Sequence, residues 1–97
     1  MATASLSTHV LDTGTGRPAV DVTVSLHRGD EELALVHTDA DGRARLADGL
    51  AGGVYRIVFH PPSPFFRRVE LEVELGDGHY HVPLLVSPYS CASYRGS

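Results

Sequence analysis

The 97-residue sequence predicts an all-β sandwich of seven or eight short strands, with little or no helix. Apolar and polar residues alternate with a period of two over several segments, which is the pattern of a strand with one buried face. Turn-forming residues separate these segments at intervals of about 8–12 residues, as they do in sandwiches. No segment shows the 3.6-residue apolar period of an amphipathic helix.

In the N-terminal half, the alternation predicts strands at 6–12, 20–27 and 32–38. It is clearest in the second of these, where polar residues separate Val20, Val22, Val24 and Leu26. Turns rich in glycine and aspartate bound the strands, at 14–18, 29–30 and 39–42. We expect the last of these turns to be an ordinary strand connection, held by bonds from an aspartate side chain to the backbone.

In the C-terminal half, the same argument predicts strands at 54–60, 69–75, 79–86 and 89–95. The segment 69–75 is the clearest, because Val69, Leu71, Val73 and Leu75 alternate with three glutamates. The predicted turns lie at 52–53, 61–64, 76–78 and 87–88. The chain shows no linker or repeat, and its length cannot hold two separate cores, so residues 1–97 are expected to form one domain.

Composition excludes several classes of partner. The net charge is −4, and the eight cationic residues are all arginines without a basic run, which disfavours nucleic acid and anionic membranes. The lone Cys91 excludes an internal disulfide framework. The N-terminal residues lack the features of a signal peptide, and no apolar run approaches the roughly 18 residues of a membrane span. The expected location is the cytoplasm.

The short chain also limits the depth of any pocket. A protein of this mass exposes roughly 5,400 Å² when folded against about 15,000 Å² when unfolded, which leaves only a modest core. A site built from one subunit would therefore be shallow, and a second subunit is expected to help form it.

Histidine is the most informative residue type, with six in the chain. On a strand, His79 and His81 point to the same face about 7 Å apart. That face would hold a metal ion if a third ligand such as His9 joined it. The two imidazoles would serve equally well as general acid and base, since they titrate close to neutral pH. Periodicity alone leaves both functions open. It also leaves open that the two histidines are simply solvated on an exposed strand.

Two further features have a functional and an ordinary interpretation. Asp12-Thr13-Gly14 matches the active-site signature of aspartic proteases, but the same residues also suit the turn that ends a strand. The guanidinium of Arg43 suits polarising a urea or imide carbonyl, although a surface arginine is common.

Four segments spread along the chain belong together: Ser7-Thr8-His9-Val10-Leu11-Asp12, Thr38-Asp39-Ala40-Asp41-Gly42-Arg43, His79-Tyr80-His81-Val82-Pro83-Leu84-Leu85 and Tyr94-Arg95-Gly96-Ser97. Taken together, they resemble one family along the whole chain, the 5-hydroxyisourate hydrolases, which are transthyretin-related enzymes of urate degradation. The last two segments, near the C-terminus, are the most specific. The transthyretin hormone carriers lack the histidine at position 81 and this ending, so the enzyme is favoured over a non-catalytic ligand-binding protein or a generic adhesin-type sandwich.

The resemblance implies a transthyretin-like β-sandwich that acts as a homotetramer, with sites at the subunit interface. It implies that His9, Arg43, His81 and Ser97 are catalytic, that His9 and Arg43 also bind the substrate with Tyr94, and that neither a metal ion nor another cofactor takes part. His79 has no implied role. In the implied reaction, water opens the six-membered ring of 5-hydroxyisourate, and Ser97 places its hydroxyl or terminal carboxylate near that water.

The sequence departs from the family pattern in three places. Cys91-Ala92-Ser93 replaces a usual Tyr-Ser-Thr, the connection 59–69 is short and rich in proline, and the stretch 29–31 is shortened. We expect these changes to affect assembly more than catalysis.

Overall fold

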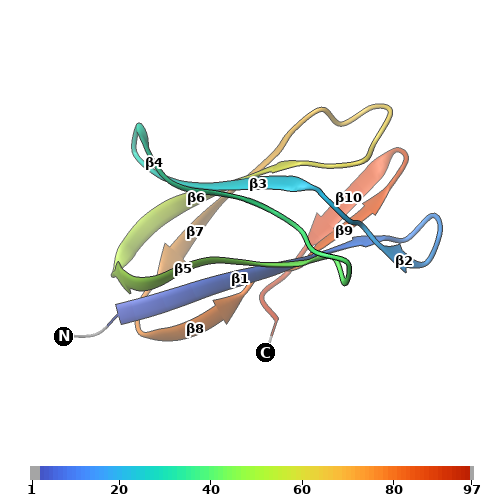
Figure 1. Cartoon of the computed structure of the whole chain (residues 1–97). Helices are drawn as coiled ribbons and strands as arrows, with labels where there is room; N and C mark the ends of the chain where they lie inside the picture. The colour runs from blue at the N-terminus through green and yellow to red at the C-terminus, as the bar shows by residue number, and fades with distance from the viewer. Residues whose placement is uncertain (1–2, 97) are drawn as a thin grey trace.

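Ten strands in two sheets make up the fold, as seen in a computed structural model that describes residues 3–96 (Figure 1). The first five strands are β1 (Thr3–Asp12), β2 (Arg17–Pro18), β3 (Thr23–Arg28), β4 (Glu31–His37) and β5 (Arg43–Ala51). The others are β6 (Gly53–His60), β7 (Val69–Leu75), β8 (Gly78–His81), β9 (Leu84–Ser87) and β10 (Ser90–Ser93). Within residues 3–96 there is no helix, and hence none that could cross a membrane.

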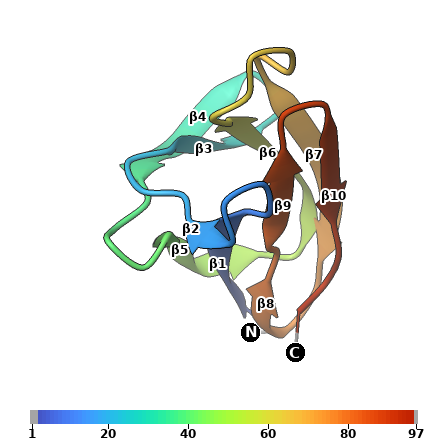
Figure 2. The ribbon, with the colours of Figure 1, turned by 90° about the vertical axis from the view of Figure 1, so that its right-hand side faces the viewer.

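Strand β1 is the centre of the first sheet. It pairs antiparallel with β5 along one edge and parallel with β8 and β9 along the other, while β2 pairs with its C-terminal end. Strands β8 and β9 pair one after the other along β1, and Figure 2 shows β10 beside β9. The second sheet has the antiparallel order β4-β3-β6-β7.

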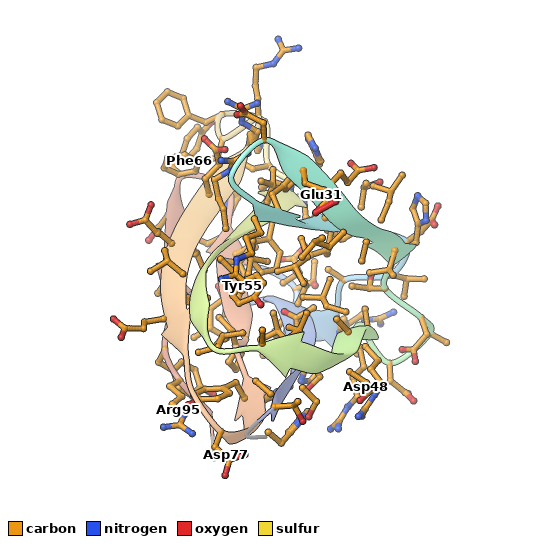
Figure 3. The ribbon with its side chains drawn as sticks, turned by 90° about the vertical axis from the view of Figure 1, so that its left-hand side faces the viewer. Glu31, Asp48, Tyr55, Phe66, Asp77 and Arg95 are labelled. Atoms are coloured by element: carbon orange, nitrogen blue, oxygen red, sulfur yellow. The ribbon has the colours of Figure 1, made fainter. Side chains whose placement is uncertain are left out.

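The core lies between the two sheets. Its largest fully buried side chains include Tyr55, Phe59 and Leu6, and Tyr55 lies well inside the outline of the molecule in Figure 3. The tyrosine hydroxyl is satisfied there, because it donates to the Ala51 carbonyl and accepts from Arg28 Nη1 at 3.1 Å. The chain exposes 5661 Å², close to the surface expected from its mass.

The predicted all-β sandwich is confirmed, but residues 3–96 form ten strands rather than seven or eight. The predicted strand 79–86 is divided into β8 and β9 at Val82-Pro83, where proline has no N–H to donate to a ladder. The two-residue β2 was predicted as part of a turn, and β5 was not predicted at all.

The strand predicted from Val20 begins instead at Thr23. Val20 is 56 % exposed, and Asp21 has a φ of 60°, a left-handed conformation that interrupts an extended strand. Buried Thr38 secures this corner, because its hydroxyl donates to the Ala19 carbonyl and accepts from the Val22 N–H. By contrast, β7 matches its prediction residue for residue, with glutamates on the exposed face.

Candidate active site

The outward face of β1 supplies the first group of the candidate site. Leu6, Thr8 and Val10 are fully buried, so the alternating side chains of Ser5, Ser7 and His9 lie on the opposite face. This is the face predicted for His9. The buried Thr8 hydroxyl donates to the Val82 carbonyl at 2.6 Å and ties β1 to the segment between β8 and β9.

Strand register brings the other groups to the same face. His9 lies directly opposite Arg43 in the antiparallel β1–β5 pair. On the other edge of β1, Ser7 lies opposite His81 and Ser5 opposite His79 in the parallel β1–β8 pair. His79 and His81 therefore share a face, as predicted, and three of the four residues predicted to be catalytic converge on β1.

The turn before β5 fixes the position of Arg43. The Asp39 carboxylate accepts hydrogen bonds from the N–H groups of Arg43 at 3.0 Å and Asp41 at 2.9 Å. Gly42 has a φ of 75°, and a Cβ there would lie 2.6 Å from the Val10 carbonyl oxygen, so the turn requires glycine. The prediction of an aspartate-bonded turn at 39–42 is confirmed.

These contacts predict a pH-dependent contribution to stability. The backbone N–H groups of Arg43 and Asp41 lower the pKa of Asp39 below its ordinary value of 3.8. The stabilisation is therefore present above that value and is lost as the pH falls through the lowered pKa. We expect Asp39→Asn to melt at a lower temperature than wild type at pH 7, and the difference to shrink steadily in acid.

Thermal unfolding followed by circular dichroism from neutral to acidic pH measures this difference. Asp77→Asn, in the exposed turn between β7 and β8, is the matched control. A difference between wild type and Asp39→Asn that stays constant with pH would contradict the assignment.

Hydrogen bonds connect the two histidines of β8 through serines of β1. Ser5 Oγ lies 2.6 Å from His79 Nδ1, and Ser7 Oγ lies 2.9 Å from both His79 Nε2 and His81 Nδ1. Nε2 of His9 is buried, and no group within residues 3–96 bonds it. The site thus holds His9, whose Nε2 is free to bond a further group, beside His79 and His81, which are linked through Ser7.

The environment of His81 favours a neutral imidazole. Burial lowers its pKa below the ordinary value of 6.5, and the nearby charges of His9, Arg43 and His79 lower it further. A neutral imidazole has one nitrogen free to accept a proton, which is the state that a general base needs.

A shallow depression of about 590 Å³ opens over this face. The set that lines it is polar: Ser7, Thr8, Asp39, Arg43, Ala44, Arg45, His79 and His81. Arg45 is held at the rim by an ion pair with Asp48. The shallowness agrees with the expectation that a chain this short cannot enclose a pocket alone.

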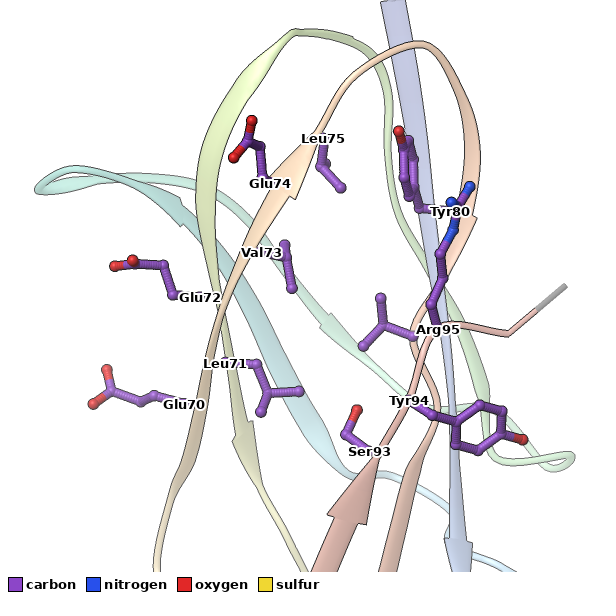
Figure 4. Close-up of a pocket in the computed structure, with 11 residues that line it drawn as sticks. Glu70, Leu71, Glu72, Val73, Glu74, Leu75, Tyr80, Ser93, Tyr94 and Arg95 are labelled. Carbon is purple, nitrogen blue, oxygen red and sulfur yellow. The ribbon is translucent and has the colours of Figure 1, made fainter.

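A second depression, also of about 590 Å³, lies between β7 and the C-terminal segment. Figure 4 shows Leu71, Val73 and Leu75 turned toward it and Glu70, Glu72 and Glu74 turned away. The aliphatic side chains of β7 line it together with Tyr80, Tyr94 and Arg95, and no histidine is among its lining residues. Tyr94, predicted to bind the substrate, is 57 % exposed and lines this second depression, apart from the depression over β1 that is lined by Arg43 and His81.

The C-terminal segment packs directly against His81. The Gly96 N–H donates to the His81 carbonyl at 2.6 Å, and a Cβ on Gly96 would lie only 2.8 Å from His81 Cδ2. Arg95 stacks on the Tyr80 ring at 4.2 Å from its centroid, which holds this segment in place. Ser97, the fourth predicted catalytic residue, lies outside the described residues.

The remaining sequence motifs have ordinary structural roles. Asp12 Oδ1 accepts from the N–H groups of Gly14 at 2.9 Å and Thr15 at 3.2 Å, so this carboxylate caps the turn after β1. Asp12-Thr13-Gly14 is thus the end of a strand, which is the ordinary interpretation of these residues and not the protease one. Within residues 3–96, no three His, Cys, Asp or Glu side chains are placed to share a metal ion.

Comparison with known proteins decides the family. A model described as the HIUase/Transthyretin family matches residues 6–96. The chain belongs to this family. A 5-hydroxyisourate hydrolase of Caulobacter vibrioides is 43% identical to it, covering 97% of this chain and 99% of the relative.

This HIUase/Transthyretin family member is similar to solved structures of a hydrolase and of a transthyretin. The structure of Klebsiella pneumoniae 5-hydroxyisourate hydrolase matches with a TM-score of 0.89 and 38% identity, covering 97% of this chain and 99% of that one. Sea bream transthyretin in complex with thyroxine matches with a TM-score of 0.83 and 27% identity, covering 94% and 93%.

Sequence reasoning missed Ser7, and it predicted the aspartate-bonded turn at 39–42 without connecting that turn to the position of Arg43. Ser7 belongs to a segment that carries the family resemblance, but a serine in a strand gives no distinctive signal by itself. The alternation of β1 places Ser7 on the His9 face, and this was the one clue to its position.

Proposed function

We propose that this chain is a 5-hydroxyisourate hydrolase that opens the six-membered ring of its substrate with water in urate degradation. The product is 2-oxo-4-hydroxy-4-carboxy-5-ureidoimidazoline. The observation that carries the proposal is the cross-strand pair His9–Arg43 beside His81, on one open face of the first sheet. Relatives named 5-hydroxyisourate hydrolase, at 36% to 43% identity, support the same substrate.

The chemistry assigns a task to each group. One imidazole takes a proton from water while the water oxygen bonds to the ring carbonyl carbon. The guanidinium of Arg43 stabilises the negative charge that develops on the carbonyl oxygen, as a preorganised cation does in other acyl transfers. The carbon–nitrogen bond then breaks, and the leaving nitrogen receives a proton from an imidazole. We assign the proton transfers to His9 and His81, and we propose that Ser97 orients the water.

The alternative is a non-catalytic ligand-binding protein, as the likeness to a transthyretin bound to thyroxine suggests. The lining of the depression over β1 favours the enzyme, because its histidines can transfer protons and its Arg43 can stabilise developing negative charge. The Klebsiella hydrolase is also the more similar of the two, at 38% against 27% identity.

We further propose a homotetramer in which facing subunits complete the site and Tyr94 of one of them reaches the substrate. The shallowness of the depression and the exposed position of Tyr94 support this arrangement.

A cytoplasmic location stays a prediction, and it agrees with the unpaired, half-buried Cys91, whose thiol pKa is raised by burial.

The decay of freshly made 5-hydroxyisourate, followed by its ultraviolet absorbance, tests the function. Because the substrate also decays spontaneously, the expected result is an acceleration that is proportional to enzyme concentration. The lowered pKa of His81 predicts that this activity persists below pH 6.5 and is lost only as the imidazole protonates at a lower pH. Slow decay unchanged by the protein would leave the binding alternative.

Gly96→Ala is expected to lower kcat by about tenfold or more, because its Cβ would press on the His81 ring and small displacements of catalytic groups are costly. The fold should survive, since the clash lies at the end of the described chain. Gly52→Ala is the matched control, because a Cβ there would lie at an ordinary 3.5 Å from its nearest neighbour. Equal turnover in the two variants would remove Gly96 from the support of His81.

A further inference from the structure

Ser7 bridges the two histidines of β8, and the role inferred for it rests on the proposed hydrolase function. Ser7 Oγ is within hydrogen-bond distance of two imidazole nitrogens at once, Nδ1 of His81 and Nε2 of His79, each at 2.9 Å. A serine hydroxyl has one proton to donate and two lone pairs that accept. When both imidazoles are neutral, both hydrogen bonds can form only if one nitrogen accepts the serine proton and the other nitrogen donates its own proton to the serine oxygen.

The series of hydrogen bonds that links His81, Ser7, His79 and Ser5 can therefore run in two directions. In the first, His81 Nδ1–H donates to Ser7, Ser7 donates to His79 Nε2, and His79 Nδ1–H donates to Ser5. This leaves Nε2 of His81 without a proton, ready to accept one. In the second, every bond is reversed and His81 Nε2 carries a proton that it can give away. The two directions match the two states that the hydrolysis requires in turn.

We propose that Ser7 and His79 form a proton relay for His81, in which Ser7 passes protons between His81 Nδ1 and His79 Nε2. When His81 Nε2 takes a proton from the attacking water, the Nδ1 proton moves to Ser7 Oγ, and the hydroxyl proton of Ser7 moves to His79. The positive charge then resides on His79, and His81 is neutral with its proton on Nε2.

The return step restores the starting state. His81 Nε2 gives its proton to the leaving ring nitrogen, His79 Nε2 returns its proton to Ser7, and Ser7 gives one to His81 Nδ1. Over the cycle one water proton reaches the leaving nitrogen and the protein is unchanged. The relay needs no oxidant, metal ion or other reactant.

The surroundings explain why charge is better placed on His79. His81 is half-buried, and His9 on β1 and Arg43 on β5 face it, so a second positive charge there is opposed by burial and by repulsion. His79 is exposed to solvent, with Asp48 of β5 close enough to interact with its charge, although Asp48 also pairs with Arg45. Asp39 lies near the opposite end of the site, beside Arg43 and His9.

Ser7 and His79 are accordingly positioning residues, since His81 and not they meets the substrate. Ser7→Ala removes the bridge, and we expect kcat to fall by about 10- to 100-fold with KM changed by less than about twofold. His79→Gln removes the proton acceptor and should cause the same loss. The double variant should be no worse than either single variant, because both break one chain.

Two variants serve as controls. Ser7→Thr keeps the hydroxyl and is expected to restore kcat to within about threefold of wild type. Ser25→Ala removes a serine–imidazole contact of the same kind, Ser25 Oγ to His27 Nε2 at 2.8 Å, on β3 in the second sheet, and should leave kcat within about threefold of wild type. Melting temperatures of all variants show whether a loss of kcat comes from unfolding.

Two readouts separate a relay from simple structural support. In H₂O–D₂O mixtures, the plot of kcat against the deuterium fraction should be curved for wild type, because several protons move in one step. The same plot should be linear for Ser7→Ala. Long-range ¹H–¹⁵N spectra of the imidazoles should show His79 and His81 titrating together in wild type and independently in Ser7→Ala. The spectra need no substrate, so they decide on the relay even if wild type fails to accelerate 5-hydroxyisourate decay and the proposed function falls. Unchanged kcat in Ser7→Ala, or identical imidazole titrations with and without Ser7, would overturn the proposal.

Discussion

His81→Asn is expected to lower kcat for 5-hydroxyisourate hydrolysis by about 10²–10⁴-fold, the range for loss of a general acid–base group. Asparagine keeps a polar atom near the position of Nδ1 and preserves the fold around Ser7, but it cannot take a proton from water near neutral pH. Stopped-flow absorbance with freshly generated substrate measures the loss against the spontaneous decay.

His37→Asn is the matched control, since it makes the same change on exposed β4 in the other sheet. It should leave turnover within about twofold of wild type, as surface changes generally do. Wild-type turnover in His81→Asn would remove His81 from proton transfer and, with it, the mechanism proposed above.

Arg43→Gln should have an effect of similar size, lowering kcat/KM by about 10²–10³-fold, because it removes the cation that faces the developing oxyanion. It should also change the pH dependence in a defined direction. The charge of Arg43 helps to lower the pKa of His81, so its removal should raise that pKa toward 6.5 and move the acid limb of the activity profile to higher pH.

Arg43→Lys separates the two effects. Lysine keeps the positive charge, and hence the low pKa of His81, but loses the planar guanidinium that can contact two oxygens. We expect an acid limb close to that of wild type with a reduced kcat. Arg45→Gln, at the rim of the depression, controls for a general change of charge. If Arg43→Gln left both the rate and the acid limb unchanged, Arg43 would have no part in the site.

The sandwich was predictable from the sequence because most strands have one buried and one exposed face. Strand β7 is the clearest case, since its glutamates and aliphatic residues separate cleanly. Strand β5 was missed because its pairing with β1 contains two register shifts and Gly49 has a φ of 64°, so its side chains do not alternate regularly.

The candidate site was predictable only in part. Alternation alone placed His79 and His81 on one face and His9 opposite the buried residues of β1. The meeting of His9 with Arg43, and of Ser7 with His81, depends on the register between strands that are far apart in sequence. No local pattern encodes that register, and it was the family resemblance that selected His9, Arg43 and His81 together.

The parallel pairing of β1 with β8 has a consequence for the order of folding. Ser7 meets His81 across 74 positions of sequence, whereas β3, β4, β6 and β7 pair with strands much nearer to them in the chain. Contacts between distant positions carry the larger cost of loop closure and form late. A chain emerging from the ribosome is therefore expected to assemble most of the second sheet before Ser7 meets the histidines of β8. We expect catalytic competence to be the last property that this protein acquires.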